Sequence, residues 1–183
     1  RVVEMSSQKT ESPWLFDARG IKSKENRTSF SPNSHGIISV SDIARISRGE
    51  ELGKSCLNRL STDSLVNHPE RVAIMAGEGI AEFYTQPLET HWTLRSNIKK
   101  NTGNYCSPKI VCLKTGRIIR AALDYKGIIT LQSVYNIHLD PAWVEKGITI
   151  EFLCALLNSP RINEAYIKSI TDSKALFPQI TQK

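Results

Sequence analysis

Residues 108–139 read PKIVCLKTGRIIRAALDYKGIITLQSVYNIHL, and this stretch decides the fold. It contains runs rich in β-branched residues, at 109–113, 117–123, 128–131 and 133–139. Two turn signals interrupt them, Thr115-Gly116 and Tyr125-Lys126-Gly127, and both are typical of hairpins. The pattern predicts an antiparallel meander, in which strands that follow one another in sequence are neighbours in the sheet.

Two amphipathic helices are predicted to follow this sheet. Thr149 is placed to cap the first, whose apolar residues recur at the spacing of one buried stripe, at Ile150, Leu153, Cys154 and Leu157. Ser159 followed by Pro160 marks the start of the second. Because the strands precede the helices instead of alternating with them, we expect an α+β fold, an antiparallel or mixed sheet with packing helices, two of them near the C-terminus.

The rest of the chain suggests one domain and an arm. Residues 1–36 are polar and predict an N-terminal arm or linker, whereas residues 37–183 carry the apolar runs and predict the domain. With 183 residues, 40% of them hydrophobic and 23% charged, the chain is long enough to fold by its own core. It opens with Arg1 instead of methionine, so we expect it to be an excised part of a longer protein.

Composition also sets expectations about the compartment. No run approaches the roughly 18 apolar residues of a membrane span, so we expect no membrane partner. The four cysteines show no metal-binding or paired spacing, and the four histidines are equally scattered. We therefore expect reduced thiols, no metal site and a cytoplasmic location.

The positive charge is concentrated in one segment. Residues 95–126 hold eight basic side chains and one acidic one, whereas the formal charge of the whole chain is only +6. A local excess of Lys and Arg favours binding to a polyanion, because each neutralised phosphate releases a condensed counterion. The charge pattern is equally compatible with a solvated basic hairpin. It also leaves open a docking module whose basic residues meet an acidic protein surface.

Two patterns suggest catalysis, and each lacks part of what the chemistry needs. Residues 49–55, GEELGKS, have only three residues between their glycines, where a phosphate-binding loop needs four. Asp124-Tyr125-Lys126 and Asp172-Ser173-Lys174 match the acid-x-Lys triplet of magnesium-dependent nucleases, yet no acid lies between Arg95 and Leu123 to share the ion. Turns explain both triplets better. A small magnesium-dependent nuclease stays open as the alternative function.

A series of short motifs resembles the TaqI-like C-terminal specificity domain of DNA restriction–modification enzymes. The motifs in the first half are GIISV at 36–40, RGEELGK at 48–54, and GEGI at 77–80 with FY at 83–84. The second half matches better, with PKIV at 108–111, TGR at 115–117, AALD at 121–124, SVY at 133–135, LLNS at 156–159 and FPQI at 177–180. The resemblance extends over about residues 37–180.

This resemblance implies a target-recognition module without catalysis or a cofactor of its own. In such enzymes a separate N-terminal domain binds S-adenosylmethionine and methylates adenine N6, sometimes together with a magnesium-dependent nuclease. The expected partners are therefore double-stranded DNA and the methyltransferase domain of the parent chain. The parent would be a type II restriction–modification enzyme, including the type IIG class, or an adenine-N6 methyltransferase.

The resemblance also assigns DNA contacts to two regions, the 48–54 loop and the 109–120 segment. Their basic residues are Arg48, Lys54, Lys109, Lys114, Arg117 and Arg120. From the charge distribution we add Arg95, Lys99 and Lys100. Most of these side chains would contact phosphates, and Arg95 and Arg117 are our candidates for reading guanine edges in the major groove.

Overall fold

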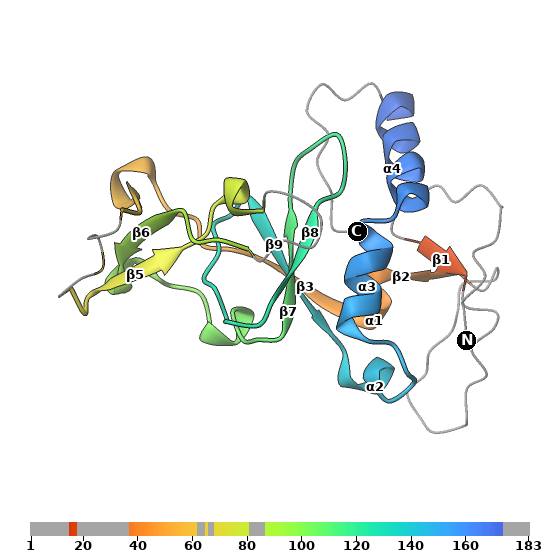
Figure 1. Ribbon diagram of the computed structural model, residues 1–183, viewed down its shortest axis with the longest axis horizontal. Helices are drawn as coiled ribbons and strands as arrows, with labels where there is room; N and C mark the ends of the chain where they lie inside the picture. Colours follow the sequence, from red (N-terminus) through yellow and green to blue (C-terminus); the bar gives the residue numbers. More distant parts are fainter. Residues whose placement is uncertain (1–14, 18–36, 62–64, 66–67, 81–86, 174–183) are drawn as a thin grey trace.

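The computed structural model describes residues 15–17, 37–61, 65, 68–80 and 87–173 (Figure 1). Within these residues the strands form three antiparallel sheets. The central sheet holds β3 (Ala44–Arg48), β9 (Val134–Leu139), β7 (Lys109–Leu113) and β8 (Ala121–Asp124). A small sheet holds β4 (Asn58–Arg59), β6 (His91–Leu94) and β5 (Arg71–Ile74), and a two-stranded ribbon holds β1 (Leu15–Asp17) and β2 (Ile37–Ser39).

The helices complete an α+β fold, which confirms the predicted class. They are α1 (Val40–Ile43), α2 (Pro141–Val144), α3 (Ile150–Leu157) and α4 (Pro160–Ser173). Short 3-10 turns lie between the strands, η1 (Lys54–Cys56), η2 (Gly77–Gly79), η3 (Arg95–Asn97) and η4 (Thr102–Asn104). The predicted arm, residues 1–36, falls almost entirely outside the described residues.

The central sheet differs from a simple meander in its strand order. It runs β3-β9-β7-β8, so β7 lies between β8 and β9, and β9 pairs with β7 instead of with β8. The strand predicted at 117–123 begins only at Ala121, because the amide of Ile119 donates to Asn163 Oδ1 of α4 at 2.6 Å and leaves the ladder. The run predicted at 128–131 forms isolated bridges to Glu50 and Met75 instead of a strand.

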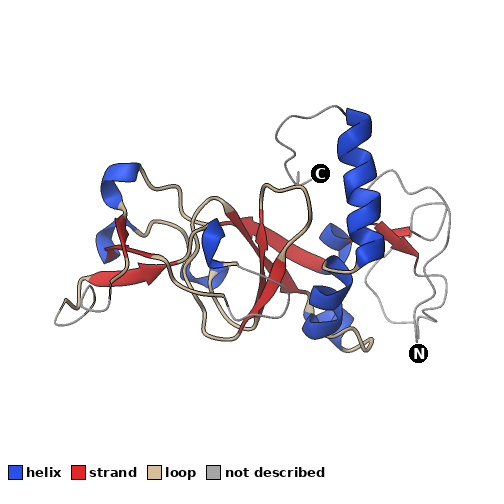
Figure 2. Ribbon diagram, turned by 45° about the horizontal axis from the view of Figure 1, so that its top comes forward, coloured by secondary structure: helices blue, strands red, loops and turns tan. Residues whose placement is uncertain are grey.

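One face of the central sheet carries the main core. Ile110, Cys112, Ala121 and Ile137 on the strands pack against the helices, whose buried residues are Trp143, Leu153, Cys154, Leu157, Ile162 and Tyr166. The helix starts are those that the sequence predicts, since Thr149 Oγ1 accepts from the amide of Phe152 at 3.1 Å and Ser159 Oγ from that of Ile162 at 3.3 Å. Figure 2 shows α4 at the end of the molecule opposite the small sheet.

The other face of the central sheet is covered by loops. Val111, Ala122 and Val134 pack against a smaller cluster of Met75, Ile80 and Ile128. Residues 129–132 run between Met75 and Glu50 and hydrogen-bond to the backbone of both, which joins the end of β5 to the segment that follows β3. The two sheets are therefore connected through backbone ladders as well as through side chains.

Lys109 corrects one prediction of the sequence. Its side chain has no exposed surface, and its ammonium donates to the carboxylate of Asp124 and to the carbonyls of Tyr105, at 3.1 Å, and Ile128, at 2.9 Å. Burial lowers the pKa of Lys109, and the neighbouring Asp124 carboxylate opposes that shift. An enclosed ammonium with three acceptors cannot reach a phosphate, so the prediction that Lys109 contacts DNA is wrong.

Asp124 completes the same buried network. Its carboxylate also accepts the amides of Lys126, Gly127 and Ile128, at 2.7–3.1 Å, and so fixes the turn that follows β8. Gly127 has a φ of +76°, which favours glycine. The turn predicted at Asp124-Tyr125-Lys126 is therefore confirmed.

We predict that Lys109→Met lowers the free energy of unfolding by about 3–5 kcal/mol, because the Asp124 carboxylate would be left buried without its cation. Urea denaturation followed by circular dichroism measures this loss. Lys126→Met is the matched control, since Lys126 is exposed and contributes only its backbone amide to Asp124. Equal stability of the two variants would contradict the structural role of Lys109.

Candidate nucleic-acid interface

Glu50 is a buried carboxylate that organises the loop carrying two of the predicted contacts. It is only 2% exposed, and it accepts the amides of Lys99, at 3.3 Å, and Lys100, at 2.9 Å. Gly49 makes this position possible, because a Cβ there would lie 2.3 Å from the carbonyl oxygen of Thr130. Gly49 of the apparent phosphate-loop motif therefore allows close backbone packing. The Glu50 carboxylate beside it holds residues 99–105 through hydrogen bonds, and we call this arrangement the clamp.

Tyr105 connects this clamp to the Lys109 network. Its hydroxyl donates to Glu50 Oε1 at 2.9 Å, while its carbonyl accepts from Lys109. Burial, and then the hydrogen bond to Glu50, raise the pKa of Tyr105 far above its ordinary value, so the phenol stays protonated and acts as a donor. A continuous chain of polar groups therefore runs from Asp124 to the amides of Lys99 and Lys100.

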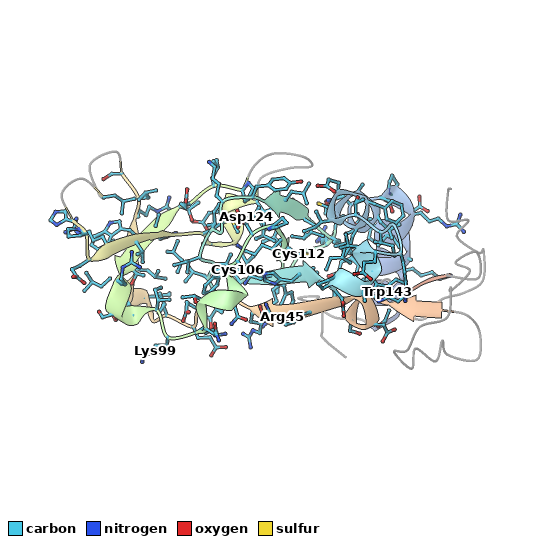
Figure 3. The ribbon with its side chains drawn as sticks, turned by 90° about the horizontal axis from the view of Figure 1, so that it is seen from below. Arg45, Lys99, Cys106, Cys112, Asp124 and Trp143 are labelled. Carbon is cyan, nitrogen blue, oxygen red and sulfur yellow. The ribbon has the colours of Figure 1, made fainter. Side chains whose placement is uncertain are left out.

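Six cations lie on the clamped loop, on β3 beside it, or on the η1 and η3 turns, and we call them the loop patch: Arg45, Arg48, Lys54, Arg95, Lys99 and Lys100. Lys100 Nζ donates to the carbonyl of Arg48 at 3.1 Å, which brings the end of β3 against the loop. The Thr93 hydroxyl donates to the carbonyl of Cys56 at 2.7 Å, which places η1, with Lys54, beside the strand that leads into Arg95. Figure 3 shows Arg45 and Lys99 toward the same edge of the molecule, with the buried Asp124 farther from that edge.

The members of the loop patch differ in how much of their charge faces solvent. Lys54, Arg95 and Lys99 are exposed, whereas Arg48 and Lys100 are partly buried. Arg48 Nη1 lies 3.4 Å from Glu51 Oε1, so one exposed carboxylate offsets part of the positive charge. An exposed pair of this kind is worth little, and Glu51 does not prevent the arginine from meeting an anion.

Arg45 was not among the residues predicted from the sequence to contact DNA. It is exposed, and its guanidinium donates to the carbonyl of Gly103 at 2.9 Å and to Asn104 Oδ1 at 3.2 Å, so it holds η4 next to β3. The alternation of apolar and polar residues in 44–47, ARIS, was the available signal, because it places Arg45 and Ser47 on the face opposite Ala44 and Ile46. Arg45 lies outside the basic segment 95–126, from which the charge-based contacts were predicted.

Lys114, Arg117 and Arg120 form a separate set on the loop between β7 and β8. This hairpin loop is fastened to α4, since Tyr166 donates from its hydroxyl to the carbonyl of Gly116 at 3.0 Å. Lys109 and Leu113 are the two ends of β7, which places the set roughly 13 Å along the strand from the Tyr105–Lys109 end. The η4 turn lies near the other end of β7, since it leads into Tyr105, whose carbonyl accepts from Lys109. The basic segment 95–126 is therefore divided and does not form one continuous stripe.

The residues required by the nuclease alternative are not assembled in the described part of the chain. Asp124 is enclosed with Lys109, and no group of three or more His, Cys, Asp or Glu side chains among the described residues is placed to hold a metal ion. Asp172 and Ser173 of the second triplet belong to α4, so the turn predicted there is wrong, and the structure describes no side chains at 172–174. Within the same described ranges, no helix has the length and apolar character needed to cross a membrane.

A comparison with protein families decides the identity of the domain. The family model described as the TaqI-like C-terminal specificity domain matches residues 72–183. The chain belongs to this family. No curated protein matches the sequence. The resemblance seen in the sequence motifs is thereby confirmed, and the chain is a DNA-specificity module of the restriction–modification enzymes.

In this TaqI-like specificity domain the matched residues include β5 to β9 and the C-terminal helices, whereas β3 and η1 precede the match. β3 is nevertheless an integral strand of the central sheet, because it pairs with β9 along its whole length, from Ala44 opposite Leu139 to Arg48 opposite Tyr135. The loop patch thus combines cations inside the matched range with Arg45, Arg48 and Lys54 outside it.

A partly buried histidine lies beneath the clamped loop of the specificity domain. His138 Nε2 is 3.0 Å from the carbonyl of Cys106, and because a carbonyl can only accept, Nε2 carries the proton of the neutral ring. Its buried Nδ1 has no hydrogen-bond partner among the described residues. Burial lowers the pKa of His138 below its ordinary value of 6.5; the Cys106 hydrogen bond and Asp124 oppose the shift, while Arg45 and Lys109 add to it.

We predict that the free energy of unfolding falls as the pH is lowered from 7.5 to 5.5. The unfolded state binds a proton at His138 more readily than the folded state does, so acidification through the ordinary pKa favours unfolding. Denaturation at several pH values measures the slope. His138→Gln should flatten the slope, and substitution of the exposed His68 by Gln should not. An unchanged slope in His138→Gln would refute this assignment.

Glu50→Ala tests the clamp on residues 99–105. Because three donors would lose a charged acceptor, we expect amide hydrogen exchange at Lys99 and Lys100 to become about tenfold faster or more. Native-state exchange read by NMR gives these rates residue by residue. Glu51→Ala is the control, since Glu51 is exposed and pairs with Arg48 at the surface. Exchange that is equally slow in both variants would remove Glu50 from this role.

Proposed function

We propose that this domain grips double-stranded DNA through the loop patch and selects the target sequence for a parent enzyme, while performing no bond-making step itself. The parent would be a type II restriction–modification enzyme, including the type IIG class, or an adenine-N6 DNA methyltransferase. Its methyltransferase domain would supply S-adenosylmethionine and the reacting groups. The proposal is supported by the hydrogen bonds that join the segments carrying these cations, in a member of a specificity-domain family.

The clamp supports an electrostatic role for these cations. The Glu50 carboxylate accepts hydrogen bonds from backbone amides, so it fixes the loop without forming an ion pair with the ammonium groups of Lys99 or Lys100. Lys100 keeps two further ammonium protons after bonding to the carbonyl of Arg48. Cations held at fixed positions on an ordered loop lose little side-chain and loop entropy when they meet a row of phosphates.

The hairpin loop would provide a second contact. Lys114, Arg117 and Arg120 stay predicted DNA contacts, but from the far end of β7 they would meet the backbone apart from the loop patch. The loop is anchored on α4 by Tyr166 and Asn163, so its position is fixed by the core. Two separated contacts would set the orientation of the domain on the duplex, which phosphate contacts do without reading sequence.

A labelled duplex and a salt series test the proposal. We expect the double variant Lys99→Ala with Lys100→Ala to bind unrelated duplexes more weakly by the same factor, and to reduce the slope of log K against log salt by about 2, because two phosphate contacts are lost. Fluorescence anisotropy at several KCl concentrations measures both quantities. Lys168→Ala is the control, since Lys168 is an exposed lysine on α4.

Two results would refute the proposal. One is the absence of binding to any duplex at low salt. The other is a salt slope of the double variant equal to that of the unchanged chain. A basic docking module for an acidic protein would bind polyglutamate as well as DNA of equal charge, so a competition series with polyglutamate separates that alternative from DNA recognition.

A further inference from the structure

A row of polar side chains lies on the face of the central sheet that the loops cover. Ser47 of β3 pairs with Asn136 of β9, and His138 follows Asn136 by two positions. Paired residues share a face of a sheet, and so do residues two apart on one strand. The face is identified by two hydrogen bonds to loop residues. Asn136 Nδ2 donates to Thr130 Oγ1 at 2.8 Å, and His138 Nε2 donates to the carbonyl of Cys106 at 3.0 Å.

Three buried atoms of this row have no hydrogen-bond partner among the described residues. They are Ser47 Oγ, Asn136 Oδ1 and His138 Nδ1. The Asn136 side chain has no exposed surface at all. An unpaired polar atom in such a position is costly, and proteins pair the great majority of their buried polar atoms. Three neighbouring unpaired atoms therefore point to a shared partner from outside the chain.

Asn136 needs this partner in either orientation of its amide. Its Nδ2 is bonded to the Thr130 hydroxyl, so the other amide atom, Oδ1, is the unpaired one. If the amide were reversed, the oxygen would accept from the same hydroxyl, and the nitrogen would be left without an acceptor. One polar atom of the buried amide requires a further hydrogen bond in both cases.

The charge near these atoms disfavours an ion as the partner. Asn136 Oδ1 and His138 Nδ1 are both acceptors, because Nε2 carries the ring proton, and they would repel an anion. Arg45 lies opposite His138 on β3 and would repel a cation. The neighbouring Lys109–Asp124 pair adds no net charge. The site therefore favours a neutral molecule that donates hydrogen bonds.

Water has the donors, the acceptors and the size that these atoms require. It can donate to the two acceptors and accept from the Ser47 hydroxyl, which stays within the roughly two to four hydrogen bonds of a buried water. Cβ atoms of paired residues such as Ser47 and Asn136 lie about 4.5–5.5 Å apart. One water, with hydrogen bonds of about 2.8 Å, joins polar atoms up to roughly 5.6 Å apart. A molecule of this size fits between facing side chains of β3 and β9.

We propose that Ser47, Asn136 and His138 hold ordered water between the central sheet and the loops that cover it. The water donates to Asn136 Oδ1 and His138 Nδ1 and accepts from the Ser47 hydroxyl. It extends the polar network of the clamp, because Asn136 bonds to Thr130, whose carbonyl accepts from the amide of Glu50 at 2.7 Å. This site does not depend on the proposed DNA binding.

A crystal structure of the full 183-residue chain, at a resolution that shows ordered water, is the direct test. We expect a water about 2.6–3.2 Å from Asn136 Oδ1 and equally close to Ser47 Oγ, His138 Nδ1 or both. The proposal is overturned if no water joins Asn136 to either neighbour, including the case in which the side chains rearrange and pair with other protein groups.

A titration of His138 by NMR tests the site in solution. The protonated ring needs an acceptor at Nδ1, and the water provides one. Asn136→Leu fills the position without an acceptor, so we expect the water to be lost and the measured pKa of His138 to fall. Gln132→Leu is the control, because Gln132 is exposed, and it should leave this pKa unchanged.

The charged groups that act on His138, which are Arg45, Lys109 and Asp124, are the same in both variants. Circular dichroism checks that each variant is folded. An unchanged pKa of His138 in folded Asn136→Leu would contradict the proposal. If Asn136→Leu does not fold, the crystal structure of the unchanged chain decides the question by itself.

Discussion

Three buried charges, those of Lys109, Asp124 and Glu50, constrain the architecture of the described part of this domain. Lys109 and Glu50 both sit inside the protein, and each must find partners, because an uncompensated charge in a nonpolar interior is very costly. Tyr105 serves both, giving its carbonyl to the ammonium and its hydroxyl to the carboxylate. The strands, the turn after β8 and the 99–105 loop are therefore tied into one polar network, and the surface cations take their positions from it.

This network explains how a short loop becomes an ordered surface. Residues 99–105 contain the 3-10 turn η4 but no longer helix or strand, yet their amides are held by Glu50 and their far end by the Arg45 guanidinium. Glu50 holds this loop through the backbone amides of Lys99 and Lys100, so the ammonium groups of the two lysines are not used in this contact. The carboxylate that orders the loop is thus distinct from the cations that the loop presents at the surface.

The sequence predicted local structure well and burial poorly. Caps at Thr149 and Ser159 depend on neighbours in the chain, so the helices that follow them could be placed. The strand order could not, because nothing local shows that β9 returns to the edge of β7. Lys109 was wrongly predicted to contact DNA, because a lysine in the sequence carries the same formal charge whether it is buried or exposed. Arg45 was missed because only the pairing of β3 with β9 brings it to the 103–104 backbone.

The two-faced small sheet has an evolutionary consequence. Its inner residues, Val72, Ile74 and Thr93, hold the sheet to the body, while Asn58 and Leu94 lie exposed on the outer face. Mutations can therefore accumulate on the outside without disturbing the packing that keeps the domain folded.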